Sequence, residues 1–223
     1  MQQPLIHPDE TGRGYYAALA LSAVNTPWMA SGLLTEEGYR AAMRKYGSRG
    51  YGLRRLNVLL TRDGIRYAAI WQFGHPVATR ERHGMTEAEF RAQVTASPQV
   101  LAHVDAAATP AGPQFAAIWE EKTGPAQKVT AGLSTAEFDL QRATLTGEGY
   151  RLRQLAGYAD NGSARFVAVF EQGTGRRQEI FAAVPAEDFA VLSRSMTRCG
   201  LLLRDASGYV VGDAAYHTAI WEG

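Results

Sequence analysis

Two polar side chains, His103 and Asp105, have the types and the spacing that acid–base chemistry uses. On an extended strand, residues two apart lie on one face, so the carboxylate could orient the imidazole as a general base, or both could bind a metal ion. A metal site needs about three or four ligands, and this pair supplies two. We therefore assign no metal and no catalytic residue; ligand contact and plain solvated surface are the favoured interpretations, and catalysis or metal binding is the third.

The single cysteine, Cys199, limits the redox and metal chemistry of the chain. One thiol excludes an internal disulfide and a zinc site built from several thiolates. A buried, inert thiol is the expectation, with a nucleophile as the alternative. Neither S-x-x-K nor G-x-S-x-G occurs, so serine-hydrolase chemistry has no candidate nucleophile, and no cofactor is predicted.

The composition indicates a folded protein without a strongly charged partner. The chain has 223 residues, 46% of them hydrophobic, and a formal net charge of +1. We expect no nucleic-acid and no membrane partner, because the charge is balanced and no apolar run approaches the roughly 18 residues of a membrane helix. The opening "MQQPLIHPDE" does not resemble a signal peptide, so we expect a cytoplasmic protein if Met1 is the native start, and a secreted one if a signal was removed.

An internal repeat organises the chain. The stretch "FAAIWEE" recurs as "YAAIWQF", "FVAVFEQ" and "HTAIWEG", which places one aromatic column at intervals of 48, 51 and 51 residues; a weaker fifth copy surrounds Ala20. We predict that this column is core, because large aromatic side chains are usually buried. Its members are Trp71, Trp119, Phe170 and Trp221.

Further markers in the same phase predict the elements of each repeat. "LTEEGY", "MTEAEF" and "LSTAEF" read as helix starts with Thr35, Thr86 and Ser134 as N-caps, and Glu89 and Glu137 complete capping boxes. Pro185 takes the fourth cap position without a hydroxyl. Alternating stretches that end in turn signals such as "DNG" predict a hairpin before each helix, and the segments "PAQKVTAGL" and "RRQEIFAAV" could add a third strand.

Polar positions that differ between repeats are the candidate ligand contacts. Leu53, Leu101, Leu152 and Leu203 form a constant column on the first hairpin strand, and we place the next two variable positions on the same face. A constant framework with variable polar positions is how repeat surfaces adapt to ligands. The candidate ligand-binding residues are Arg55, Asn57, His103, Asp105, Gln154, Asp205 and Ser207.

Two charged columns are weaker candidates. The carboxylates that follow the aromatic column could form a rim that binds a cation or amine, or could simply reach solvent at strand ends: Glu120, Glu171 and Glu222. Arg54, Arg153 and Arg204 could bind a carboxylate or phosphate ligand. A recurrent salt bridge to an acidic residue of a neighbouring helix would explain these arginines without a ligand.

The repeated stretches resemble a known family. "GYRLRQLAGYADNGSARFVAVFE" and "LLLRDASGYVVGDAAYHTAIWEG", with "HGMTEAEF" or "AGLSTAEF" after complete units, are similar to the bacterial tandem repeat, also called the polyglycine hydrolase-like structural repeat. The resemblance implies a non-catalytic arc of repeats, which in the polyglycine hydrolases lies beside a separate serine-hydrolase domain. That domain has no counterpart among the motifs of this chain.

Together these observations predict an α+β protein. We expect one domain over residues 1–223, built of about five strand-strand-helix repeats of about 50 residues in a curved or closed, propeller-like array. The approximate units are 1–49, 50–98, 99–148, 149–199 and 200–223. The predicted function is a non-enzymatic binding or scaffold module for a peptide, glycan or small ligand. The alternatives are an accessory domain of a larger secreted hydrolase and a stand-alone enzyme with a polar site at the centre of a ring.

Overall fold

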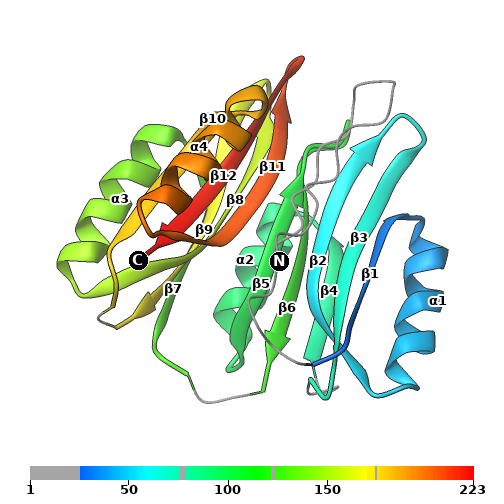
Figure 1. The fold of residues 1–223 in the computed structure, drawn as a ribbon. Helices are drawn as coiled ribbons and strands as arrows, with labels where there is room; N and C mark the ends of the chain where they lie inside the picture. Colours follow the sequence, from blue (N-terminus) through cyan, green and yellow to red (C-terminus); the bar gives the residue numbers. More distant parts are fainter. Residues whose placement is uncertain (1–25, 76–78, 122–123, 174) are drawn as a thin grey trace. The chain divides into compact units, whose positions relative to one another are not determined.

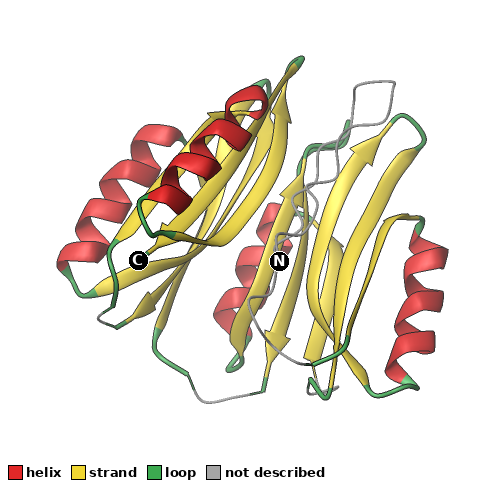
Figure 2. Cartoon of the chain, viewed as in Figure 1, coloured by secondary structure: helices red, strands yellow, loops and turns green. Residues whose placement is uncertain are grey.

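Four repeats of one design make up the described chain. The computed structural model describes residues 26–75, 79–121, 124–173 and 175–223. Each repeat is a strand, a helix and then a hairpin, and its three strands form one antiparallel sheet covered by its helix on one face (Figures 1 and 2). The fold is therefore α+β. The weak fifth copy around Ala20 lies outside the described residues.

The first two repeats have the following elements. In the first repeat they are β1 (Trp28–Leu34), α1 (Glu36–Gly47), β2 (Tyr51–Thr61) and β3 (Gly64–Phe73). In the second repeat they are β4 (Thr79–Met85), α2 (Glu87–Ala96), β5 (Val100–Ala107) and β6 (Gln114–Glu120).

The last two repeats follow the same order. The third repeat comprises β7 (Gln127–Leu133), α3 (Thr135–Gly147), β8 (Tyr150–Asp160) and β9 (Ser163–Gln172). The fourth repeat comprises β10 (Gln178–Pro185), α4 (Ala186–Arg198), β11 (Leu202–Val211) and β12 (Ala214–Glu222).

The segment before each helix is a full strand and belongs to the hairpin that follows the helix. The sheet orders are β1-β3-β2, β4-β6-β5, β7-β9-β8 and β10-β12-β11, so the second hairpin strand lies at the centre of every sheet. The optional third strand of the sequence prediction is thus confirmed. The repeating unit is strand-helix-strand-strand, and it begins at this strand rather than at the hairpin.

Local sequence signals fix the helix starts and one hairpin turn. Thr86 and Ser134 accept hydrogen bonds from Glu89 N and Glu137 N, and both capping boxes form as predicted. Thr35 caps α1, whereas Pro185 makes no side-chain cap. In the turn between β8 and β9, Asn161 and Gly162 have φ of 47° and 73°, the left-handed conformation that an Asn-Gly turn supplies.

The aromatic column forms the core, as predicted. Trp71, Trp119, Phe170 and Trp221 are all buried. In the first repeat the helix residue Tyr46 packs on Trp71, with ring centroids 4.7 Å apart. Burial of such side chains supplies the main stabilising term of the fold, about 25 cal/mol for each Å² of apolar surface.

The chain falls into two compact units, each holding two repeats. The described part of one unit comprises the first two repeats, up to residue 124, and that of the other the last two, from residue 125. Within the first unit, β2 packs against β5 and β6 of the neighbouring repeat. Within the second unit, β8 packs in the same way against β11 and β12.

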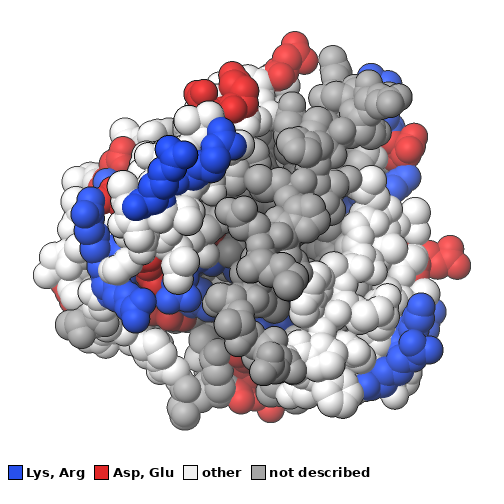
Figure 3. Space-filling model, in the orientation of Figure 1, with Lys and Arg blue, Asp and Glu red and all other residues white. Residues whose placement is uncertain are grey.

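Three further features of the described chain concern Cys199, the surface charges and membrane-spanning helices. The prediction of a buried Cys199 is wrong: the residue is exposed because it caps the C-terminus of α4, where its N–H bonds Ser195 O and Thr197 O. Acidic and basic side chains are interspersed on the described surface, in keeping with the balanced charge (Figure 3). Among the described residues, no helix is both long enough and apolar enough to cross a membrane.

Candidate functional site

A β-bulge near the start of each hairpin decides where the variable strand residues point. The register slips between Leu53 and Arg55, and the same slip follows Leu101, Leu152 and Leu203. One extra residue reverses the facing of everything after it. The prediction that the variable positions share the face of the leucine column is therefore wrong, and these positions lie on the opposite face, away from the helix.

On that face, the second repeat of the first unit bonds the first repeat. Asp105 Oδ2 accepts a hydrogen bond from Val58 N at 3.0 Å, and His103 Nε2 donates to Leu56 O at 3.0 Å. Both side chains are almost fully buried, with exposed fractions of 2% for His103 and 4% for Asp105. The pair is thus brought together, but it contacts the backbone of β2.

The second unit repeats this arrangement with other residues. Asp205 Oδ2 accepts from Leu155 N at 3.1 Å, and Thr218 Oγ1 donates to Leu155 O at 2.6 Å. Ser207 N donates to Thr218 Oγ1 at 3.2 Å. In both units a buried carboxylate therefore links one repeat to the backbone of the next.

The remaining strand candidates lie on the corresponding faces of the first and third sheets. Gln154 is buried, whereas Arg55 and Asn57 are half-buried. Contacts between repeats account for the burial of His103, Asp105 and Asp205 without a ligand. Ligand binding by the column as a whole stays a prediction.

The carboxylate column and the arginine column pair with each other. Glu120 Oε1 lies 3.3 Å from Arg54 Nη1 and 3.1 Å from His75 Nε2. The arginine column was expected to form salt bridges with acidic residues of neighbouring helices. Its partners are instead the carboxylates at the ends of central sheet strands, and each arginine stands at the bulge of its own strand.

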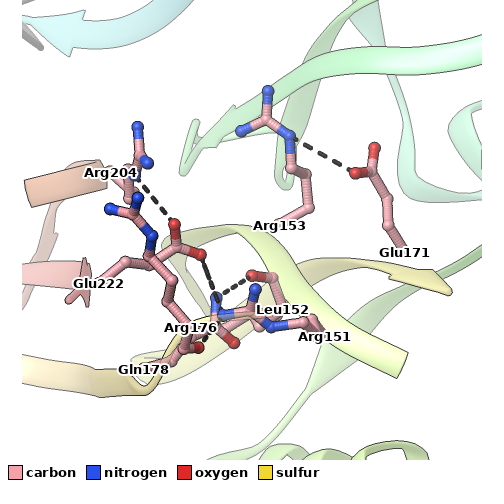
Figure 4. Close-up of polar contacts among 8 residues, drawn as sticks. All are labelled: Arg151, Leu152, Arg153, Glu171, Arg176, Gln178, Arg204 and Glu222. Carbon is pink, nitrogen blue, oxygen red and sulfur yellow. Dashed lines mark hydrogen bonds and ion pairs between the residues drawn. The ribbon is translucent and has the colours of Figure 1, made fainter. Parts of the chain in front are cut away.

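Figure 4 shows the network of the second unit, in which Glu222 is the centre. Arg204 Nε lies 2.9 Å from Glu222 Oε2, and Arg151 Nη2 lies 3.3 Å from Oε1, which also accepts from Gln178 Nε2 at 2.9 Å. Glu171 lies 3.7 Å from Arg153. These carboxylates are compensated by protein cations, and a cation or amine site at this rim stays a prediction.

A groove in the first unit brings together polar residues that the sequence did not single out. It has a volume of about 790 Å³ and lies between α1 and β4, with the start of β3 as its floor. We call it the α1–β4 groove. Its lining residues are Glu36, Tyr39, Arg40, Met43, Arg44, Ile65, Tyr67, Glu81, Arg82, His83, Gly84 and Gln114. Its size falls within the range of ligand pockets.

His83 is the centre of the polar wall of this groove. Its Nδ1 lies 2.5 Å from Glu81 Oε1 and its Nε2 lies 3.6 Å from Glu36 Oε1. The ring meets Tyr39 and Tyr67 edge-on, with centroid distances of 5.4 and 4.9 Å. The hydrogen bond to Glu81 raises the pKa of His83 against the opposing effect of burial, so the charged imidazolium is favoured.

The ionisable groups around His83 are also shifted. Arg40 bonds Glu36 at 2.5 Å and lowers the pKa of that carboxyl. Burial raises the pKa of Tyr39 and of Tyr67, and the nearby carboxylates add to both shifts, so the two phenols stay neutral. The wall thus combines two carboxyl groups, an imidazole whose pKa is raised and a guanidinium within a few ångströms of one another.

The second unit shows that the fold does not require these polar groups. Glu81 pairs with Ile118 on the central strand, and Ile180 pairs with the equivalent Ile220, so Glu81 corresponds to Ile180. Two residues further along, His83 corresponds to Ala182. Helix and strand positions match Tyr39 to Phe138 and Tyr67 to Phe166 in the same way. Four apolar side chains in one unit thus correspond to four polar ones in the other.

The same comparison explains the hollow. In the second unit, Tyr209 and Tyr216 stack with a centroid distance of 5.6 Å, and Ile180 and Ala182 pack on the same core cluster. The first unit has Ala107 and Gln114 at the two tyrosine positions. The missing ring volume leaves space beside Tyr67, so the groove arises from substitutions within a shared framework.

The chemistry available in the groove is recognition of a polar ligand, or proton transfer by His83. In the part of the chain that the structure describes, no group of three or more His, Cys, Asp or Glu side chains is placed to hold a metal ion. The groove is not evident from the sequence, because its residues come from two repeats and share no motif. A comparison of the first two repeats with the last two would have shown the exchange of apolar for polar residues.

Comparison with known proteins agrees with the repeat architecture. The family model described as polyglycine hydrolase-like, structural repeat, matches residues 25–73, 76–122, 124–173 and 180–223. These four matches coincide with the four sheets and begin near the strand that precedes each helix. A search of curated proteins gives no match.

Proposed function

Since the chain belongs to the polyglycine hydrolase-like structural repeat family, we propose that it is a binding module without enzymatic activity, and that an extended peptide is its ligand in the α1–β4 groove. The carrying observation is the exchange of four apolar residues for Tyr39, Tyr67, Glu81 and His83 in one unit only. Polar residues that packing does not demand, gathered along a groove, are typical of a binding site.

A peptide is favoured over a glycan by the position of β4. This strand lies at the edge of its sheet, so one side of its backbone is not paired with a strand of that sheet. An extended peptide can bond such an edge through its main chain while side chains contact the groove. The name of the family also refers to a hydrolase of polyglycine, which is itself a peptide.

The proposal can be tested by NMR with a capped peptide of three Gly-Ser pairs. At millimolar peptide, we expect shift changes in amides of α1 and β4, and we expect none in their counterparts α3 and β10. The double variant E81I/H83A carries the residues of the second unit at these two positions and should still fold but lose the shifts. Equal shifts in the variant, or shifts confined to other elements, would reject the groove as the site.

Proton transfer is the second candidate function. Glu81 holds His83 Nδ1, as a carboxylate orients the imidazole of a general base. Against this, Nε2 also faces the Glu36 carboxyl, and the raised pKa of His83 favours the protonated ring over the free base that proton abstraction needs. Mass spectrometry of the peptide after the titration separates the two candidates, since an enzyme would leave cleaved peptide.

A curved or closed arrangement of the four repeats is a separate proposal. Each repeat packs on its neighbour within a unit in the same way, and such repetition generates curvature in repeat proteins. Small-angle scattering would distinguish an arc or a ring from two loosely linked units, because the radius of gyration differs between them.

A further inference from the structure

The α1–β4 groove contains acidic groups that are already compensated. Glu36 pairs with Arg40 at 2.5 Å, and Glu81 pairs with His83 at 2.5 Å. His83 also stands 3.6 Å from Glu36. A cationic ligand would have to displace these partners, so the carboxylates are poor sites for an amine.

Two further cations line the groove without such partners. Arg44, on the last turn of α1, and Arg82, on β4, are exposed, and within the ranges that the structure describes neither forms a salt bridge; Arg82 acts on Glu89 of α2 only through the longer-range attraction that lowers the pKa of that carboxyl. Figure 3 shows basic side chains gathered at the right-hand edge, where Figure 1 draws α1. With His83 charged, the lining has four basic and two acidic side chains. The uncompensated charge of the groove is therefore positive.

An apolar floor separates the positive walls. Met43 and Ile65 are half-buried and Tyr67 is buried, and all three line the hollow between Arg44 and Arg82. Guanidinium groups bind carboxylates through charge-assisted, often bidentate hydrogen bonds. An extended ligand that packs on Met43, Ile65 and Tyr67 can thus present one carboxylate to each arginine.

From this arrangement we propose that the α1–β4 groove selects an acidic peptide, whose carboxylates are bound by Arg44 and Arg82. This inference rests on the proposed function, because it assigns a ligand class to the same groove. The carboxylates are those of aspartate or glutamate side chains, since two of them are needed at separate positions.

The test uses three capped hexapeptides in which glycine alternates with aspartate, serine or lysine. We expect the aspartate peptide to bind about tenfold more tightly than the serine peptide, since two ion pairs at exposed arginines together contribute a modest gain in affinity. Added salt should reduce this advantage, because exposed charges are screened. Isothermal calorimetry measures the affinities, and NMR shifts confirm the groove as the site.

Variants separate the two arginines from the net charge of the protein. R44A/R82A should bring the affinity for the aspartate peptide down to that for the serine peptide. The control R62A/R194A removes two exposed arginines elsewhere and should leave the preference intact. R44E/R82E should prefer the lysine peptide, which gives a positive signal that misfolding cannot produce.

The outcomes distinguish the preference for an acidic peptide from peptide binding itself. Equal affinity for the three peptides, or an unchanged aspartate affinity in R44A/R82A, would overturn the acidic preference while leaving peptide binding in place. No groove shift with any of the three peptides would refute peptide binding itself.

Discussion

Replacing Asp205 by alanine tests the link between repeats in the second unit. The carboxylate of Asp205 has an exposed fraction of 2%, and its Oδ2 accepts the N–H of Leu155 at 3.1 Å. Leu155 is fully buried in β8. Alanine has no acceptor, so the Leu155 N–H would be left in the interface without this partner.

The expected destabilisation follows from the cost of a buried, unsatisfied donor. Such a group costs about 1 to 3 kcal/mol, and hydrogen bonds to charged acceptors lie in the upper part of that range. Removing Asp205 also relieves the desolvation of a buried carboxylate, which offsets part of the loss. We expect a loss of about 2 kcal/mol in the free energy of unfolding. Asp205→Asn keeps an acceptor oxygen and should lose about 1 kcal/mol or less.

Hydrogen exchange at the Leu155 amide provides a local readout. A loss of about 2 kcal/mol corresponds to roughly thirtyfold faster exchange if this amide exchanges through opening of the interface. Asp139→Ala is the matched control, because that carboxylate has a side-chain exposure of 58% and forms only an exposed ion pair with Arg142. If the Leu155 amide exchanges no faster in Asp205→Ala than in Asp139→Ala, the carboxylate does not hold the two repeats together.

Three further predictions concern the core, a helix cap and the groove. Trp119→Ala should lower the free energy of unfolding by about 3 to 5 kcal/mol in urea denaturation, since Trp119 is buried and Arg80 covers its ring at 4.7 Å; a smaller loss would contradict its core role. Ser134→Ala should cost about 1 kcal/mol by the same assay, because the hydroxyl that accepts the Glu137 N–H disappears, and an unchanged midpoint would argue against the cap. The raised pKa of His83 predicts that its pairing with Glu81 and Glu36 stabilises the first unit fully below the unfolded-state pKa of about 6.5, and that this contribution is lost as pH rises through the folded-state pKa. The difference in melting temperature between wild type and His83→Gln should therefore shrink from pH 6 to about pH 9; a constant difference would contradict it.

The sequence predicts the framework well because the residues that pack the core recur at one interval along the chain. The aromatic column is buried and the caps form where Thr86 and Ser134 precede a glutamate by three residues. These signals are local, and they recur along the chain, the aromatic residue in all four repeats and the hydroxyl cap in three. The third strand was predicted only as an option, because it pairs with a hairpin that lies beyond the helix.

The face of the sheet on which the variable strand residues lie was not predictable from the alternation of apolar and polar residues alone. Arg54 is the extra residue of a bulge, and the pattern of Leu53 and Arg55 does not reveal it. Only the later leucine Leu56, which pairs with Ala69 on the helix side, shows that the alternation has shifted. A one-residue slip therefore moved the candidate residues from a presumed surface to an interface between repeats.

The groove was not predictable from the sequence for a different reason. His83 and Glu81 belong to the second repeat, whereas Tyr39 and Tyr67 belong to the first. Neither set has a spacing that indicates chemistry. Their convergence depends on how adjacent repeats pack, which a comparison of single repeats does not contain.

The carboxylates that join the repeats also cover backbone donors on two edge strands. Val58 and Leu155 lie on β2 and β8, the outermost strands of their sheets, and their N–H groups point away from their own sheet. Outward N–H groups are templates on which a strand of another molecule can pair and start aggregation. Asp105 and Asp205 occupy these donors with side chains that cannot extend a sheet. Within each unit, a buried carboxylate at the boundary between the two repeats thus occupies a backbone donor on which a fourth strand could otherwise pair.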